Sequence, residues 1–338
     1  MIELKDDRLV FSFPDVHPEA RFRLEFQRTL RIPDDGEDHH LPPGLGRFPV
    51  RHVDDHRDRV PPAWIRRGGV MLPMYRAEAM WLNFRSPRGY PFAVKVAAGK
   101  INAVTGEAWD DGIHRDPQDY LVVPEQPWLD GYCVEEGVIR QFVAAPLGEG
   151  WTAEEQLTGE GEHGGVQLVA CPMRAERWEE LKRERRRAFG ADKAQLDACC
   201  TGVAESADMG LAAGGRMRQE IYDDPHGLDD WDRRHTSRCF VHLTDALAWR
   251  AITGERPPTT PPTAKQYTDA GLPWFDYYDA DQGVLQGSER LAKLKSLLEK
   301  AREQGRPSPL PENEPVRPER VVELGDERPA DVVREGRF

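Results

Sequence analysis

The feature that most constrains the fold is a strictly alternating run from Arg21 to Ile32. Apolar and polar side chains take turns along it, which is the period of a strand with one buried face and one exposed face. The apolar positions are Phe22, Leu24, Phe26, Leu30 and Ile32. Arg28 alone breaks this face. The run therefore predicts a long, half-buried strand with one charged residue in its apolar row.

A second alternating run comes just before it, in Leu9, Phe11 and Phe13, and Pro14-Asp15 marks a turn between the two. We therefore expect an antiparallel pair of strands. Further short apolar runs bounded by Gly, Pro or Asn lie at 70–74, 80–84, 92–97, 120–123, 138–147 and 166–171. Because helical periodicity is nearly absent up to residue 173, we expect residues 1–173 to form a β-rich antiparallel sandwich or open barrel.

The pattern changes from residue 174 onward. Helical spacing predicts a helix over 175–189, and residues 240–243 are typical of a buried strand. A short helix is expected from Asp245 to Thr253, with Gly254 placed to end it. The fold class expected is therefore α+β, in which residues 174–305 form a mixed helical and irregular region packed against the β-rich region.

The strongest helical pattern runs from Ser288, a suitable N-cap, to Gln304. One stripe of this predicted helix carries Leu291, Leu294, Leu298 and Ala301. The stripe needs a partner surface. An aromatic segment from Gly271 to Tyr278 is also expected to be buried against the core, since four large rings are poorly accommodated in water.

The last segment, residues 306–338, is rich in Pro, Glu and Arg and is expected to be a disordered tail. It contains a repeat: Arg317-Pro318-Glu319-Arg320-Val321-Val322-Glu323-Leu324-Gly325 is followed eleven residues later by Arg328-Pro329-Ala330-Asp331-Val332-Val333-Arg334-Glu335-Gly336. Two weak copies of one motif on a single tail can raise the effective concentration of a docking peptide. We therefore interpret residues 317–336 as a docking tail for a protein partner.

Charge and composition restrict the partners and the compartment. Lys and Arg number 46 and Asp and Glu number 59, so the net charge is −13 and a phosphate backbone is repelled. The basic run from Lys182 to Arg187 is the exception, and we interpret it as a solvated helix face or a contact with an acidic patch of another copy. We predict no nucleic-acid partner. No apolar run approaches the length of a membrane span, and the N-terminus lacks a secretory pattern, so we expect a cytoplasmic protein.

The familiar catalytic motifs are missing from the sequence. It contains no G-x-S-x-G, H-E-x-x-H, C-x-x-C or complete phosphate-binding loop. The strongest chemical signal is a concentration of His and Asp near the N-terminus. A helical turn from Arg51 would place His52, Asp55 and His56 on one face, with His39 and His40 close by in sequence. Two imidazoles and a carboxylate suit Zn²⁺ or Fe²⁺, whereas the alternative is a solvated acidic loop followed by a short surface helix.

Two functions remain open from the sequence. The first is a non-enzymatic interaction or assembly protein of the cytosol, based on the missing motifs, the amphipathic helix and the repeated tail, with homo-oligomerisation as one form. The alternative is a metal-dependent enzyme, a hydrolase or an oxygenase, that uses the His and Asp residues between positions 39 and 56 and a divalent cofactor, Zn or Fe.

Overall fold

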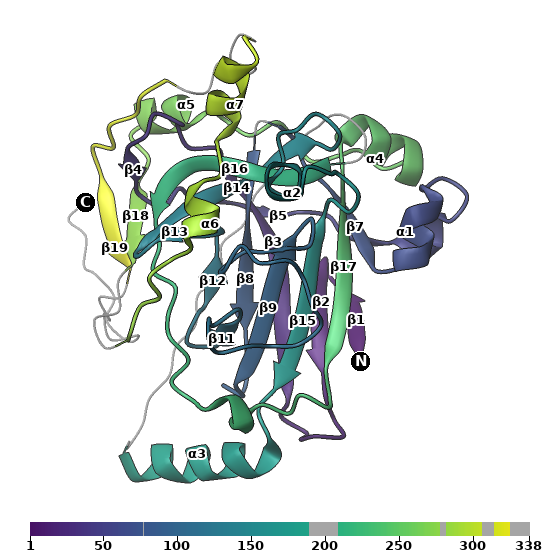
Figure 1. Cartoon of the computed structure of the whole chain (residues 1–338), viewed down its shortest axis with the longest axis vertical. Helices are drawn as coiled ribbons and strands as arrows, with labels where there is room; N and C mark the ends of the chain where they lie inside the picture. The colour runs from purple at the N-terminus through teal and green to yellow at the C-terminus, as the bar shows by residue number, and fades with distance from the viewer. Residues whose placement is uncertain (77, 189–208, 278–281, 306–313, 325–338) are drawn as a thin grey trace, which may run out of the picture.

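The computed structural model of the chain describes residues 1–76, 78–188, 209–277, 282–305 and 314–324 (Figure 1). One large, mostly antiparallel sheet organises these residues, and a separate ribbon of two strands lies beside it. The strands of the large sheet are β1 (Ile2–Lys5), β2 (Arg8–Ser12), β3 (Arg21–Leu30), β4 (Asp38–His39), β5 (Gly44–Arg47), β6 (Arg51–His52), β7 (Val70–Pro73), β8 (Glu78–Arg85), β9 (Phe92–Ala98), β10 (Ile101–Asn102), β11 (Leu121–Val123), β12 (Trp128–Leu129), β13 (Gly131–Glu135), β14 (Val138–Pro146), β15 (Val166–Pro172), β16 (Met209–Arg218) and β17 (Ser237–Thr244). The ribbon consists of β18 (Trp274–Tyr277) and β19 (Val321–Leu324).

Helices are short and lie around the sheet. They are α1 (Pro62–Arg67), α2 (Ala153–Thr158), α3 (Ala175–Ala188), α4 (Ala246–Thr253), α5 (Ala264–Asp269), α6 (Glu289–Ala292) and α7 (Leu297–Glu303), with 3-10 turns η1 (Val53–His56) and η2 (Leu228–Asp230). In the described part of the chain, no helix combines the length and the apolar character that crossing a membrane requires. The expectation of a sheet-rich fold with additional helices is confirmed.

The alternating run forms strand β3, as predicted, but the expectation of one exposed face is wrong, because Glu25, Gln27 and Thr29 on its polar face are buried as well. Its partner on one side is β2, in the antiparallel register that sets Phe11 opposite Phe22, and on the other side it pairs with β8. Phe11 and Phe22 stack with ring centroids 4.7 Å apart, and Phe22 also contacts Phe92 of β9 at 4.8 Å. The apolar face of β3 thus packs on a strand from a distant part of the sheet.

The single break in the apolar row of β3 has a buried partner. Arg28 is 0% exposed and pairs through its guanidinium with Glu78 at the start of β8, which is 1% exposed. Arg28 also donates to the carbonyl oxygen of Thr259 at 3.2 Å, and the Tyr75 hydroxyl donates to that of Pro258 at the same distance. The proline-rich segment 257–262, which is neither helix nor strand, therefore covers this ion pair.

The two predicted regions of the chain share one sheet. Strand β16 pairs with β14 along most of its length, and β17 pairs with β15. Both β16 and β17 come from the part of the sequence expected to pack against the sheet from outside. Strands from both sides of residue 173 therefore belong to one sheet, and the expected division does not fall at an edge of it. Pairing between strands far apart in sequence leaves no local pattern from which this could be predicted.

Several local predictions for residues 174–305 agree with the structure, and others do not. Helix α4 begins at its N-cap Asp245 and ends at Gly254 in the left-handed conformation, as expected. The single helix predicted from Ser288 to Gln304 is instead two short helices, α6 and α7. Ser296 starts the second one, because its side chain accepts from the amide of Glu299, while Lys295 N donates to Gln156 Oε1 at 2.8 Å. Tertiary hydrogen bonds therefore interrupt a continuous apolar stripe.

Residues 314–324 of the tail are ordered, whereas the sequence predicts disorder over the whole of residues 306–338. Val316 is buried at the edge of the main core, and β19 follows it. Strand β19 belongs to the first copy of the repeat. The second copy, at 328–336, lies outside the described residues.

Candidate functional site

The ribbon of β18 and β19 is where the aromatic segment and the tail meet. The two strands are parallel, with Trp274 opposite Val321 and Tyr277 opposite Leu324. Trp274 N donates to the carbonyl oxygen of Arg320 at 2.9 Å. On the other edge of β18, Phe275 exchanges two backbone hydrogen bonds with Leu41, at 2.8 and 2.9 Å. The tail strand has therefore taken the outer edge of β18, as a strand does when it extends a sheet.

Aromatic packing fixes β18 to the body of the protein. Trp274 is 0% exposed, and its indole N–H donates to the hydroxyl of Thr268 at 3.1 Å. Tyr267 contacts the same indole edge-on and donates its hydroxyl to the carbonyl oxygen of Pro273 at 2.8 Å. A large ring with a satisfied polar group is a stable anchor, so β18 offers a rigid edge to the tail.

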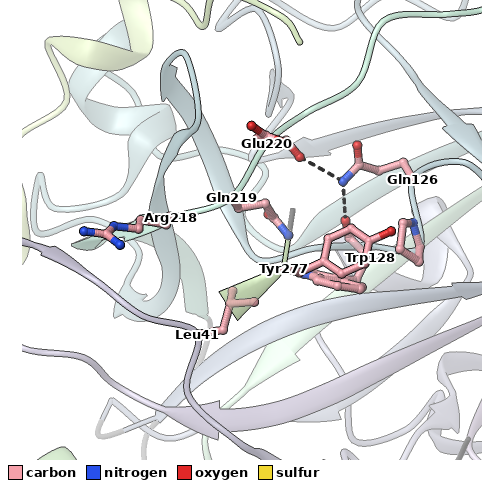
Figure 2. A pocket seen from close by; sticks show the side chains of 8 residues that line it. Leu41, Gln126, Trp128, Arg218, Gln219, Glu220 and Tyr277 are labelled. Carbon is pink, nitrogen blue, oxygen red and sulfur yellow. Dashed lines mark hydrogen bonds between the residues drawn. The ribbon is translucent and has the colours of Figure 1, made fainter. Parts of the chain in front are cut away.

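A hollow of about 230 Å³, open solvent included, lies next to the end of β18 (Figure 2). Trp128 and Tyr277 meet edge-on there with ring centroids 4.8 Å apart. The Gln126 amide donates to the carbonyl oxygens of Trp128 at 3.0 Å and Glu220 at 3.2 Å, as the dashed lines in Figure 2 show. Leu41, Pro127, Arg218 and Gln219 complete the wall. The wall of the hollow thus contains two aromatic rings and two side-chain amides, and the exposed guanidinium of Arg218 lies at its rim.

A buried carboxyl group lies beneath this hollow. Asp130 accepts from the side-chain amide of Gln219 at 2.7 Å, and its own backbone N–H donates to the side-chain carbonyl oxygen of Gln219 at 2.9 Å. Burial raises the pKa of Asp130 to about 7, and hydrogen bonds from Gln219 and Trp128 offset only part of that effect. Among the described residues Asp130 has no cationic partner. Asp130 therefore holds Gln219 in the floor of the hollow.

Two of the five predicted metal ligands lie near the ribbon. His40 Nδ1 is 2.8 Å from Asp276 Oδ1 of β18. His39 belongs to β4, and its Nε2 is 2.9 Å from Asp35 Oδ1. Each imidazole is thus engaged by a different carboxylate. His40 joins the chain near β4 to the ribbon, a role that the sequence analysis did not assign to it.

The other three predicted ligands lie elsewhere and do not share a helical face. His52 is in β6 with extended backbone angles, and the turn η1 begins only at Val53, which is buried. His52 and Asp55 are exposed, and His56 is half-buried. The spacing argument required a helical His52, so the structure does not bring these three residues together as expected.

The described residues do contain one group of ligand-type side chains, which the sequence analysis missed. Ligand atoms of Asp110, His114 and Asp119 all lie within 4.8 Å of one another. The ammonium of buried Lys95 lies among them, 2.7 Å from Asp119 Oδ2, 3.2 Å from Asp110 Oδ1 and 2.7 Å from the carbonyl oxygen of Gly112. All three ammonium protons thus have acceptors. Because Lys95 supplies the positive charge, we interpret the group as an internal ion-pair network.

Comparisons with protein-family models, with curated proteins and with solved structures find no match for this chain. Its function therefore has to be inferred from its own residues.

Proposed function

We propose that this chain is a non-enzymatic interaction or assembly protein of the cytosol whose C-terminal segment docks by strand addition. The observation that carries the proposal is the parallel pairing of β19 with the outer edge of β18. Strand addition obtains affinity from backbone hydrogen bonds, so an equivalent strand from a partner can replace the chain's own. The repeat in the sequence supplies a second copy of the same motif at residues 328–336.

The exposed side chains of β19 support this role. Val321 and Leu324 are each 39% exposed, among the few large apolar side chains at the surface of the described residues. An edge strand with exposed apolar residues is a common point of pairing between chains. We also propose that the large sheet forms a sandwich or open barrel that serves as a rigid support, a proposal supported by the contact of Phe22 with Phe92.

Backbone geometry supplies a matched pair of variants for testing the proposal. Because the carbonyl of Arg320 points to β18, the N–H of Val322 points the same way and that of Glu323 points outward. Proline lacks the N–H group, so Val322→Pro weakens the pairing, whereas Glu323→Pro leaves it intact.

The experiment measures how a fluorescently labelled peptide of residues 317–325 binds to the full-length chain, by fluorescence anisotropy. In the wild type the chain's own strand competes with the peptide. We expect Val322→Pro in the chain to tighten peptide binding by about tenfold or more, and Glu323→Pro to leave it unchanged. Equal binding by all three proteins, or none by the Val322→Pro chain, would contradict the proposal. Light scattering on the same three proteins then reports whether release of the strand changes the oligomeric state.

A further inference from the structure

A second hollow, of about 340 Å³ with open solvent included, lies between α1, the loop before β15, and β17. Figure 1 places α1 and the β18–β19 ribbon on opposite sides of the molecule, so this hollow is independent of the proposed docking site. Its apolar wall includes Trp64, Leu147 and Met209, and its polar groups come from Arg67, His163 and His242. A mostly apolar hollow with a few polar groups is the usual form of a small-molecule site.

His242 is the most informative of these polar residues. It is 2% exposed, and its ring lies between Trp64 and Phe240 with both centroid distances at 4.4 Å. Its Nε2 is 3.0 Å from the carbonyl oxygen of Gly68. A carbonyl can only accept, so Nε2 carries the ring proton. Burial lowers the pKa of His242 to about 4, so the ring is neutral near pH 7 and Nδ1 keeps a lone pair.

This lone pair is an acceptor that lacks a donor. Among the residues that the structure describes, none donates a hydrogen bond to Nδ1 of His242. Because His242 lines the hollow, a ligand that enters it with an O–H or N–H group can supply the missing donor.

Arg67 provides a positive charge at the same hollow. Its guanidinium donates to the carbonyl oxygens of Glu162 at 2.9 Å and His163 at 3.1 Å, and it lies over the ring of Phe240 at 5.2 Å. These partners are neutral groups, and within the described part of the chain no carboxylate pairs with Arg67. The Glu162 carboxylate points toward the His163 ring, 3.8 Å away, and is largely exposed. Arg67 thus offers a ligand a positive charge that no carboxylate of the described residues pairs with, although Glu162 is also among the residues that line the hollow.

The loop that contributes His163 is held in place before any ligand arrives. The carboxylate of Glu154 accepts from the backbone N–H groups of Glu162 at 3.0 Å, His163 at 2.8 Å and Gly164 at 2.8 Å. Gly165 is left-handed, and an added Cβ would lie 2.3 Å from the carbonyl oxygen of Val241. A loop fixed in this way lowers the entropy lost when a ligand binds.

We propose that this hollow binds a small aromatic acid that also carries a hydroxyl or N–H group. The ring of the ligand packs against Trp64 and Met209, its hydroxyl or N–H donates to His242 Nδ1, and its carboxylate lies near Arg67. A neutral aliphatic ligand lacks the ring, the hydrogen-bond donor and the carboxylate, so we expect it to bind poorly.

The test uses the full-length protein and three probes, 4-hydroxybenzoate, benzoate and phenol, with binding measured by ligand-observed NMR and by tryptophan fluorescence. We expect 4-hydroxybenzoate to bind about tenfold more tightly than benzoate, which lacks the donor, and than phenol, which lacks the charge.

Two variants separate the two contacts. His242→Phe keeps the stacking and should remove the preference for 4-hydroxybenzoate over benzoate, whereas Arg67→Met should remove the preference over phenol. Arg66→Met is the matched control, because Arg66 is exposed on the same helix and does not line the hollow. If no probe binds the wild type at up to about 10 mM, or if the three probes bind equally and neither variant changes this, the proposal is wrong. Should His242→Phe fail to fold, Arg67→Met still decides the outcome.

Discussion

Asp130→Asn replaces a buried carboxyl group with an amide. We expect the free energy of unfolding of this variant to rise relative to that of the wild type as the pH increases from acidic to alkaline. Asp130 is buried beneath the hollow beside β18, and its folded-state pKa of about 7 lies well above the ordinary aspartate value of 3.8. A folded pKa that is raised means that the folded state holds its proton after the unfolded state has lost it. The stabilising contribution is therefore complete below about pH 4 and is lost as the pH rises through about 7.

The size of the effect follows from the shift. Each pKa unit corresponds to about 1.4 kcal/mol, so between about pH 5 and pH 8 the wild type should lose about 3 kcal/mol of unfolding free energy from this group. Asparagine does not titrate. The stability difference between Asp130→Asn and the wild type should therefore shift by about 3 kcal/mol in favour of the variant over that range. The absolute gain at high pH is smaller, because the introduced amide also has to be buried at a cost of about 1–3 kcal/mol.

The assay is urea unfolding of both proteins at the two pH values, followed by tryptophan fluorescence. Asp58→Asn is the control, since Asp58 is exposed and its substitution should produce no such shift. A difference between Asp130→Asn and the wild type that is the same at both pH values would refute the reasoning, because Asp130 would then be ionised in the folded state at both pH values.

Two further predictions concern buried groups. Arg28→Met should lower the free energy of unfolding by about 3–5 kcal/mol, because it leaves the Glu78 carboxylate buried without its partner. The double variant with Glu78→Met should recover most of that loss. Equal losses in the single and the double variant, measured by urea unfolding, would contradict the ion-pair account. Gly165→Ala should be far more destabilising than Gly159→Ala. At Gly165 the new Cβ meets the Val241 carbonyl oxygen at 2.3 Å. At Gly159 nothing lies within 4 Å of the new Cβ, so the left-handed backbone alone costs about 1 kcal/mol. Similar melting temperatures for the two glycine variants would show that the loop before β15 can move.

Local patterns in the sequence predicted local structure well. The period of two in residues 21–32 identified β3, and the turn at Pro14-Asp15 identified its pairing with β2. Asp245 and Gly254 marked both ends of α4, because capping depends on residues adjacent in sequence. The same patterns could not show that β16 and β17 complete the sheet, since strand pairing across the fold leaves no periodic trace.

The sequence predicted only some parts of the candidate site. The aromatic content of residues 271–278 predicted a buried segment, yet of its described residues only Trp274 is buried. The repeat in the tail suggested docking, which stays a prediction. Nothing in either motif indicated that Trp274 and Val321 pair. The metal prediction used the density of His and Asp along the chain. In the fold His39 and His40 each meet a separate carboxylate, and that depends on contacts that spacing alone does not encode.

The most direct test of strand docking is amide hydrogen exchange at Trp274, whose N–H donates to the carbonyl oxygen of Arg320. We predict slow exchange in the wild type and in Glu323→Pro, and exchange at least about tenfold faster in Val322→Pro. Rapid exchange of this amide in the wild-type chain, or the same rate in all three proteins, would contradict the claim that the tail occupies the edge of β18.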